Sequence, residues 1–536
     1  MPSGKESLSR PAAPAGAAPA VHRPFAHRPS FMYHSVMAKT SGENNIKSAP
    51  PEGPSLNHER SITRELISFS VPLILSGLLQ QLYSWVDAFI VGNVVGESAL
   101  AAIGSTNAVN QLFIFGITGF TAGINILAAR YYGAGNTRIQ KHILYTFSIV
   151  LTTAVLLLAV SCGGAADAIL TLLSTPQDIF TDASVYLRII LCGMPFLALY
   201  NVYCAVLRGL GDSTLPLYSI VVSSAVNLVL DLLFVWAFHW GVAGAAAATF
   251  IAQAAMTGFT VLRSLSKYPY LRFAYEGASG ASNPDDATDS GRNTRSERIY
   301  TGRDLWQQDK DGTFRPARDA ALSPKFRKDI LREGLTLATP ITIQQIINAL
   351  GCLVLQGFMN TFGSTTVAAI TTAYRIDMVL LLPVINLTTG ISTLTSQNIG
   401  AGRPDRARKV LFSGSKLMAA ISLALTAVIF FLGKYLILLF GVSAETAELG
   451  GAFFTRLAAF YVIFGLANAF RGYLEGRGDV LFSGLNGIGA LIVRIILSYA
   501  LVGLFYNMVI AYAEGFSWCV MLLLYMIRYQ KIKDRA

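Results

Sequence analysis

Long apolar runs separated by short polar turns fill residues 62–268 and 327–530 of the sequence. An α-helix needs about 20 apolar residues to cross a bilayer, and many of these runs reach that length. The pattern predicts twelve transmembrane helices at approximately 66–91, 99–128, 142–164, 183–206, 215–238, 242–264, 330–358, 366–396, 410–440, 451–473, 481–505 and 506–528. We therefore expect an all-α polytopic membrane protein.

The composition agrees with this prediction and excludes several kinds of site. Of the 536 residues, 53% are apolar and only 14% are charged, whereas soluble domains carry about a quarter charged residues. The five cysteines lie in or beside apolar segments, without a CxxC pair or a histidine cluster. They are interpreted as small packing residues, so we expect no disulfide framework, no metal site and no cofactor.

The positive charges are placed as in a membrane protein rather than a nucleic-acid-binding protein. Basic side chains follow the second, eighth and twelfth predicted helices: Arg130, Arg138, Lys141, Arg403, Arg406, Arg408, Lys409, Arg528, Lys531, Lys533 and Arg535. Four other connections contain no Lys or Arg: 92–98, 165–182, 359–365 and 441–450. Because basic loops remain in the cytoplasm, this bias predicts that both termini are cytoplasmic.

Polar segments divide the chain into five parts. The predicted parts are a disordered tail at 1–60, a six-helix lobe at 61–268, a polar linker at 269–326, a second six-helix lobe at 327–530 and a basic tail at 531–536. The first tail is rich in Pro, Ala and Ser and lacks the apolar core of a signal peptide. Acidic and basic residues nearly balance in the linker, so a solvated cytoplasmic tether is expected.

The two predicted lobes repeat each other. "RYYGAGNTRIQKH" at 130–142 corresponds to "QNIGAGRPDRARK" at 397–409, and "RGLGD" at 208–212 corresponds to "EGRGD" at 475–479, with the same offset along the chain in both cases. Because six helices are an even number, both copies have the same orientation and are related by a pseudo-twofold axis along the membrane normal. The GAG segments are interpreted as helix-ending turns and topology anchors, with a cytoplasmic gate hinge as the alternative. Such duplicated lobes are typical of transport by alternating access.

Two aspartates stand out in the first half. Gln80, Tyr83 and Asp87 share one face of the first helix, and Asn227 and Asp231 share one face of the fifth. A charge inside the membrane costs about 2.5–3.5 kcal/mol on insertion scales, so buried acids are candidates for function. Two carboxylates in one apolar cavity repel each other, which favours a bound proton, whereas asparagine oxygens beside them would also suit sodium. The alternative is that either aspartate only fixes helix packing.

The corresponding helices of the second half lack these acids. The seventh predicted helix keeps a neutral polar face with Gln345, Asn348 and Gln356, which we interpret as part of a substrate cavity together with Gln80 and Tyr83. We therefore expect asymmetric coupling, with the ion chemistry in the N-terminal half.

Four further charges fall inside predicted helices of the second half. They are Arg375 and Asp377 in the eighth helix, Arg456 in the tenth and Arg494 in the eleventh. Because Arg375 and Asp377 are two residues apart, they lie on different faces and are not expected to pair. We expect the other arginines to pair with Asp377 between helices, with a substrate or gate contact as the alternative.

These motifs resemble the multidrug and toxic compound extrusion (MATE) family, in particular its DinF-like branch. The resemblance covers about residues 62–530 and rests on "LYSWVDAFIVG", "YYGAGN", "VLRGLGD", "NLVLD", "GAAAATFIAQ" and "SQNIGAGRPDRARK". It implies cation-coupled export of amphipathic, often cationic, organic compounds. It also implies an ion site in the N-terminal lobe at Asp87, Asn227, Asp231 and Thr249, with Asn201 of the fourth helix as a further member. Other branches use a glutamate of the seventh helix for sodium, and this chain has no acid in that helix after residue 333.

Three functions follow from these features. The leading one is an antiporter in the plasma membrane, driven by a proton gradient or alternatively a sodium gradient. The second is a flippase for lipid-linked precursors, which would favour a strongly cationic cavity, and the third is a membrane scaffold. No GxxxxGK[ST] motif for ATP is present, so an ion gradient is the expected energy source. The expected partners are small organic substrates and the lipid bilayer, without nucleic acid, and the expected state is a monomer.

Overall fold

The computed structural model describes residues 61–272, 306–308, 314–316 and 326–533. The predicted tail at 1–60, most of the linker and residues 534–536 lie outside the described residues. Within the described part, the first half of the chain forms α1 (Ile62–Val94), α2 (Glu97–Gly133), α3 (Thr137–Gly164), α4 (Ala166–Leu172), α5 (Gln177–Gly209), α6 (Thr214–Asp231), the π-helix η1 (Leu232–Ala237), α7 (Gly241–Lys267) and the short 3-10 helix η2 (Pro269–Leu271).

The second half repeats this series of helices. It forms α8 (Lys328–Asn360), α9 (Ser364–Leu380), α10 (Leu382–Gly400), α11 (Pro404–Leu438), α12 (Ala444–Ala458), α13 (Tyr461–Gly476), α14 (Val480–Ala500), α15 (Val502–Phe505), the 3-10 helix η4 (Tyr506–Met508) and α16 (Val509–Lys533). Ten helices of the described residues are long and apolar enough to cross a membrane, and two bent pairs, α9–α10 and α12–α13, complete twelve spans. The prediction of an all-α polytopic protein with twelve spans is therefore confirmed.

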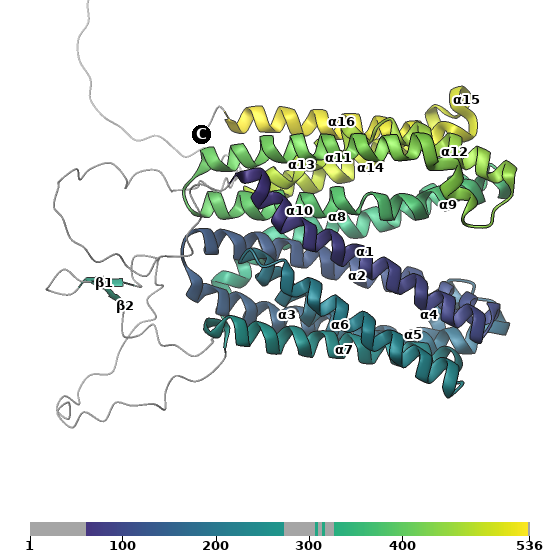
Figure 1. Ribbon diagram of the computed structural model, residues 1–536, viewed down its shortest axis with the longest axis horizontal. Helices are drawn as coiled ribbons and strands as arrows, with labels where there is room; N and C mark the ends of the chain where they lie inside the picture. Colours follow the sequence, from purple (N-terminus) through teal and green to yellow (C-terminus); the bar gives the residue numbers. More distant parts are fainter. Residues whose placement is uncertain (1–60, 273–305, 309–313, 317–325, 534–536) are drawn as a thin grey trace, which may run out of the picture. The chain divides into compact units, whose positions relative to one another are not determined.

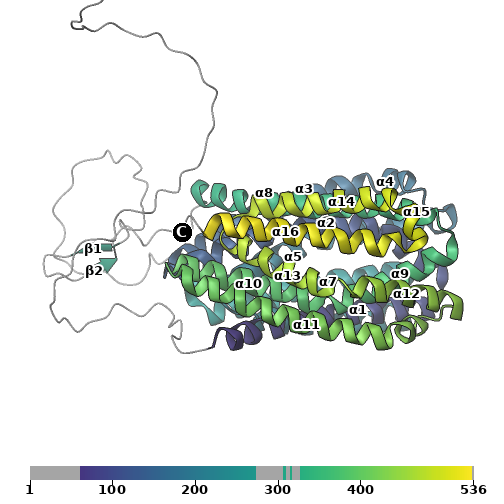
Figure 2. The ribbon, with the colours of Figure 1, turned by 90° about the horizontal axis from the view of Figure 1, so that it is seen from above.

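The structure corrects three local expectations. The eighth and tenth spans are each broken, with bends of 41° between α9 and α10 and 47° between α12 and α13. The eleventh span ends at Ala500 rather than 505 and is followed by the short helix α15. The chain then turns at Tyr506, whose φ is 50°, before α16 begins at Val509. Among the described residues of the linker, β1 (Trp306–Gln308) pairs antiparallel with β2 (Phe314–Pro316), as drawn in Figure 2.

The transmembrane helices form two lobes, each with its own apolar core. Figure 1 shows most of the purple-to-teal helices α1–α7 in one half of the bundle and most of the green-to-yellow helices α8–α16 in the other, while the first turns of α1 lie beside helices of the second half. Phe147 and Leu187 lie in the core of the first lobe, and Phe453 and Tyr473 lie in the core of the second. All four side chains are fully buried, so each lobe is packed as a unit. The lobes meet chiefly through α2 against α8 and α10, and through α1 against α10.

The repeated GAG glycines lie where the two lobes cross most closely. A Cβ atom on Gly133 of α2 would be 1.9 Å from the carbonyl oxygen of Gln397, and one on Gly400 of α10 would be 2.0 Å from the carbonyl oxygen of Arg130. Because Arg130 and Gln397 are the first residues of the two matching segments, the two contacts are copies of each other, as a twofold relation requires. Only glycine permits these backbones to approach so closely.

The second glycine of each GAG has a different role. Gly135 and Gly402 have φ angles of 75° and 68°, the left-handed conformation that ends α2 and α10. The interpretation of these segments as helix-ending turns therefore applies to the second glycine, whereas the first is required by packing between the lobes.

Candidate functional site

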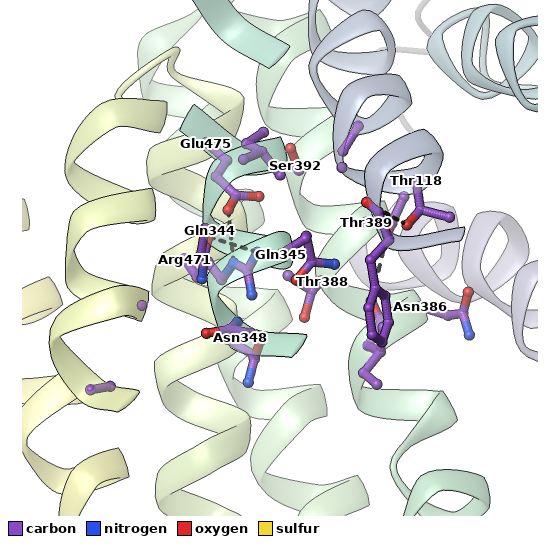
Figure 3. Close-up of a pocket in the computed structure, with 18 of the residues that line it drawn as sticks. Thr118, Gln344, Gln345, Asn348, Asn386, Thr388, Thr389, Ser392, Arg471 and Glu475 are labelled. Atoms are coloured by element: carbon purple, nitrogen blue, oxygen red, sulfur yellow. Dashed lines mark hydrogen bonds and ion pairs between the residues drawn. The ribbon is translucent and has the colours of Figure 1, made fainter. Parts of the chain in front are cut away.

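A cavity of ≈ 590 Å³ lies between the two lobes. This volume is within the range of roughly 300–1,000 Å³ that holds small organic ligands. Its wall combines apolar side chains, such as Phe115, Phe464 and Trp518, with many amides and hydroxyls. Figure 3 shows Gln344, Gln345 and Asn348 of α8 facing Thr388 and Thr389 of α10 across this space, with Thr118 nearby. Such a wall suits an amphipathic molecule of modest size.

Hydrogen bonds and ion pairs join the two lobes at one end of the bundle. We call it the basic end, because it carries the basic turns. Glu333 of α8 accepts a hydrogen bond of 2.7 Å from the Tyr131 hydroxyl and lies 3.9 Å from Arg130 of α2. Glu65 of α1 forms an ion pair of 2.9 Å with Arg406 of α11. Glu65 in "RELISFSVP" and Glu333 in "REGLTLATP" occupy corresponding positions of the repeat, since each follows the first arginine of its lobe's opening helix. Both glutamates bind a basic residue of the other lobe. Together with the glycine crossing, these bonds hold the two lobes in contact at the basic end, which we interpret as the closed end of the cavity.

A second polar cluster lies inside the N-terminal lobe, away from the walls of the cavity. It contains Asp87 of α1 and Asp231, which is the last residue of α6 before the π-helix η1 begins. π-Helical turns occur frequently at functional sites, because they re-aim the side chains beside them. Asn227 lies one turn before Asp231, and both side chains are 1% exposed. Thr249 of α7 is 8% exposed.

The carboxyl groups of Asp87 and Asp231 lie within hydrogen-bonding reach of each other and interact electrostatically. Neither carboxylate oxygen of Asp231 has a donor, and the Asn227 side-chain nitrogen is also without a partner. No lysine or arginine of the described residues forms an ion pair with either aspartate. Two neighbouring carboxylates without a cation cannot both remain ionised in an apolar environment, so the pair requires a proton or a bound cation.

The phenol of Tyr83 completes this cluster. It lies close to Thr249 and interacts electrostatically with both aspartates. Tyr186 of α5 is also close to both carboxyl groups, and sequence patterns alone gave no reason to select it. The structure thus brings together Tyr83, Asp87, Asn227, Asp231 and Thr249 from α1, α6 and α7.

The remaining predicted polar residues lie elsewhere. Asn201 lines the central cavity, and its amide donates to the Leu197 carbonyl rather than to the aspartates. Gln345 and Asn348 also line the cavity. Gln80 is exposed, and Gln356 bonds to Asn360 within α8, so neither is part of the cavity wall.

The expected pairing of Arg494 with Asp377 is wrong. Arg494 instead forms an ion pair of 2.8 Å with Glu514 of α16. The Tyr374 hydroxyl donates to Glu514 and accepts from Arg494, both at 2.7 Å. Asp377 accepts a hydrogen bond from the Tyr461 hydroxyl. The second lobe therefore contains two buried acids besides Asp377, namely Glu475 and Glu514, which the sequence patterns did not indicate.

The other two arginines predicted inside helices of this lobe, Arg456 and Arg375, form no ion pair with an acid in the described structure. Arg456 donates to the Ala452 carbonyl of its own helix at 2.8 Å, and Arg375 is exposed. Asp377 and Glu514 of the second lobe thus have donors, whereas Asp231 of the first lobe has none. This difference selects the N-terminal cluster as the better candidate for ion exchange.

Comparisons with known proteins agree with the two-lobe architecture. The sequence profile of the MatE family matches residues 72–233 and 340–500, one segment in each lobe. The "Probable multidrug resistance protein YoeA" of Bacillus subtilis strain 168 is 27% identical over 436 residues, covering 80% of this chain and 85% of that protein. YpnP from the same organism, also called a probable multidrug resistance protein, is 26% identical over 432 residues, covering 78% and 84%.

Solved structures show the same fold. An outward-facing multidrug resistance MATE family transporter of the MOP superfamily superposes with a TM-score of 0.71 at 21% identity, covering 89% of this chain and 97% of that chain. The described helices therefore follow a known transporter architecture along nearly their whole length.

Proposed function

Since the chain belongs to the MatE family, whose profile matches both lobes, we propose that it is an ion-driven antiporter. It exports amphipathic, often cationic, organic compounds by alternating access, and it acts as a transporter rather than an enzyme. The protein is a multi-pass membrane protein, and multidrug resistance proteins are among its relatives. The proposal adds the coupling ion, which is the proton, and assigns it to the N-terminal lobe.

One observation carries this assignment. Asp87 and Asp231 lie within hydrogen-bonding reach, and both oxygens of Asp231 lack a donor. A structural carboxylate buried in a membrane protein would be expected to have a cation or several donors, because an unpaired buried charge is costly. The pair therefore fits a site that is loaded and unloaded during the transport cycle.

The cycle follows from the charge of this pair. When it holds a proton, the charge is reduced and one carboxyl group donates to the other, which favours a collapsed lobe. When the proton leaves, repulsion and hydration favour an opened lobe that accepts substrate. Protons entering from outside would then displace the substrate there, so downhill proton entry drives export. No organic or metal cofactor is part of this proposal.

The decisive experiment separates the two candidate ions. Dye transport would be followed in inverted membrane vesicles under an imposed proton gradient without sodium, and under a sodium gradient without a proton gradient. Transport driven by the proton gradient alone is expected. Transport that required sodium and ignored the proton gradient would contradict proton coupling but not antiport itself.

We also propose that the basic end faces the cytoplasm, with both termini and the linker on that side, and that the transporter acts as a monomer in the plasma membrane. The bias of Lys and Arg toward this end supports the orientation. Ser290→Cys on a cysteine-free background would test it with a membrane-impermeant thiol reagent. Labelling is expected only after the cells are opened, and labelling of intact cells would refute the orientation.

A further inference from the structure

The charges on the wall of the central cavity do not balance. Four charged side chains line it: Arg208, Arg471, Glu475 and Arg494. Arg471 is neutralised by Glu475, since their Nε and Oε1 atoms are 2.7 Å apart. Figure 3 shows these two side chains together with Gln344 at one side of the cavity. Arg494 is neutralised by Glu514, as described above.

Arg208 is the cavity cation that remains without an acidic partner among the described residues. It forms none of the ion pairs in that part of the chain, and its Nε atom is buried without a hydrogen bond. Asp212, four residues later, is committed elsewhere, because its carboxylate binds Lys267 at 2.7 Å and the Tyr268 hydroxyl at 2.9 Å. A guanidinium group stays ionised at any physiological pH. The cavity therefore carries one positive charge that the described part of the protein does not compensate.

The repeat shows how this imbalance arises. Arg208 opens "RGLGD" in the first lobe and Glu475 opens "EGRGD" in the second, so they are equivalent positions, and both face the cavity. In the second lobe Arg471 neutralises Glu475. The equivalent of Arg471 in the first lobe is the uncharged Cys204, so no charged residue there can neutralise Arg208 in the same way. The two equivalent positions thus give the cavity one neutral side and one cationic side.

We propose that Arg208 binds an anionic group, a carboxylate or a phosphate, of the amphipathic substrate in the central cavity. The planar guanidinium fork matches both oxyanions, and such charge-assisted bonds are about twice as strong as neutral ones. Asn201, two helical turns earlier on the same face of α5, also lines this cavity. The apolar part of the substrate packs against Phe464 and Trp518. This inference rests on the proposed transport function and narrows its substrate class to compounds that carry a negative group, including zwitterions.

The test compares probes of opposite charge on the purified, full-length transporter. Carboxyfluorescein supplies carboxylates, flavin mononucleotide supplies a phosphate, and ethidium supplies a cation. Binding would be measured by fluorescence titration, and transport by the initial rate in vesicles, for the natural protein, Arg208→Gln, Arg208→Lys and the control Arg456→Gln. The control removes a guanidinium group whose described bond is to its own helix, away from the cavity.

Arg208→Gln is expected to weaken binding of at least one anionic probe about tenfold, because hydrogen bonds to charged groups contribute roughly 1.5–3 kcal/mol. Ethidium binding should stay equal or strengthen, Arg208→Lys should restore part of the anion binding, and Arg456→Gln should resemble the natural protein. The proposal would be overturned if Arg208→Gln changed all three probes alike, or if the natural protein bound ethidium and neither anion. The two anions distinguish a carboxylate site from a phosphate site.

The binding measurement also separates this inference from the proposed function. Loss of anion binding in Arg208→Gln, in a protein that transports no probe under any gradient, would support the anion site and refute antiport. Ethidium transport driven by protons, without any anion preference, would support antiport and refute the anion site.

Discussion

The crossing of α2 and α10 allows a quantitative test of alternating access. In Gly133→Ala, the new methyl group would lie 1.9 Å from the Gln397 carbonyl oxygen, whereas ordinary contacts begin at 3.4 Å. The neighbouring atoms are backbone, so no flexible side chain can move aside. The helices must separate, and this cost exists only in the conformation in which the basic end is closed.

The size of the effect follows from the energetics of overpacking. Inserting a methyl group into a tightly packed contact costs about 1–3 kcal/mol. Every 1.4 kcal/mol changes an equilibrium about tenfold, so the closed population should fall by about fivefold to about a hundredfold relative to the open one. Gly400→Ala should act similarly, because its methyl group would lie 2.0 Å from the Arg130 carbonyl oxygen. The control is Gly116→Ala, since nothing lies within 4 Å of a Cβ atom at that position of α2.

The measurement is the distance between the two basic turns. Spin labels would be attached at Asn136→Cys and Arg403→Cys on a background without native cysteines, and distances recorded by pulsed electron paramagnetic resonance. Both glycine variants should shift the distribution toward longer distances, and Gly116→Ala should leave it unchanged. An unchanged distribution in Gly133→Ala, in protein that is folded and inserted, would refute the assignment of this crossing as the closed gate.

Three further predictions concern single side chains. Asp87→Asn should abolish proton-driven efflux and Asp231→Asn should impair it severely, while insertion and thermal stability remain intact because the repulsion between the two carboxylates is removed. The control is Asp167→Asn, at an exposed position. Proton-coupled transport at the natural rate in Asp87→Asn would contradict the N-terminal site and make the charges of the second lobe the leading candidates. Arg494→Gln should lower the free energy of unfolding by about 3–5 kcal/mol, seen as a reduced melting temperature, because its carboxylate partner is left buried and unpaired. A stable Arg494→Gln protein would show that this ion pair is not structural. Glu333→Gln should weaken the contact between α8 and α2, since partly exposed ion pairs contribute up to about 1 kcal/mol. Thiol labelling of the cavity from the basic end should then rise by up to about fivefold, and labelling from the opposite end should stay unaltered.

The sequence determined the local and repetitive features of this protein. A transmembrane helix needs only a sufficient apolar length, so the twelve spans could be located without tertiary information. The constant offset between the GAG segments and between the other matching motifs similarly predicted two lobes of equal orientation. Helical spacing also predicted that Asn227 and Asp231 share a face, because residues four apart lie on one side of a helix.

Contacts between helices were decided by the tertiary structure alone. Whether Arg494 binds Asp377 or Glu514 depends on how α14 crosses its neighbours, and no periodicity within one helix contains that information. From the sequence, the first glycine of each GAG could be interpreted only as part of a turn. The structure shows that a side chain at this position would collide with the backbone of the other lobe, where α2 and α10 cross. The unbalanced charge of Arg208 likewise depends on which acids lie beside the cavity and which are already paired. Helix length and repetition are properties of one segment at a time, whereas pairing and close approach are properties of two segments brought together by packing.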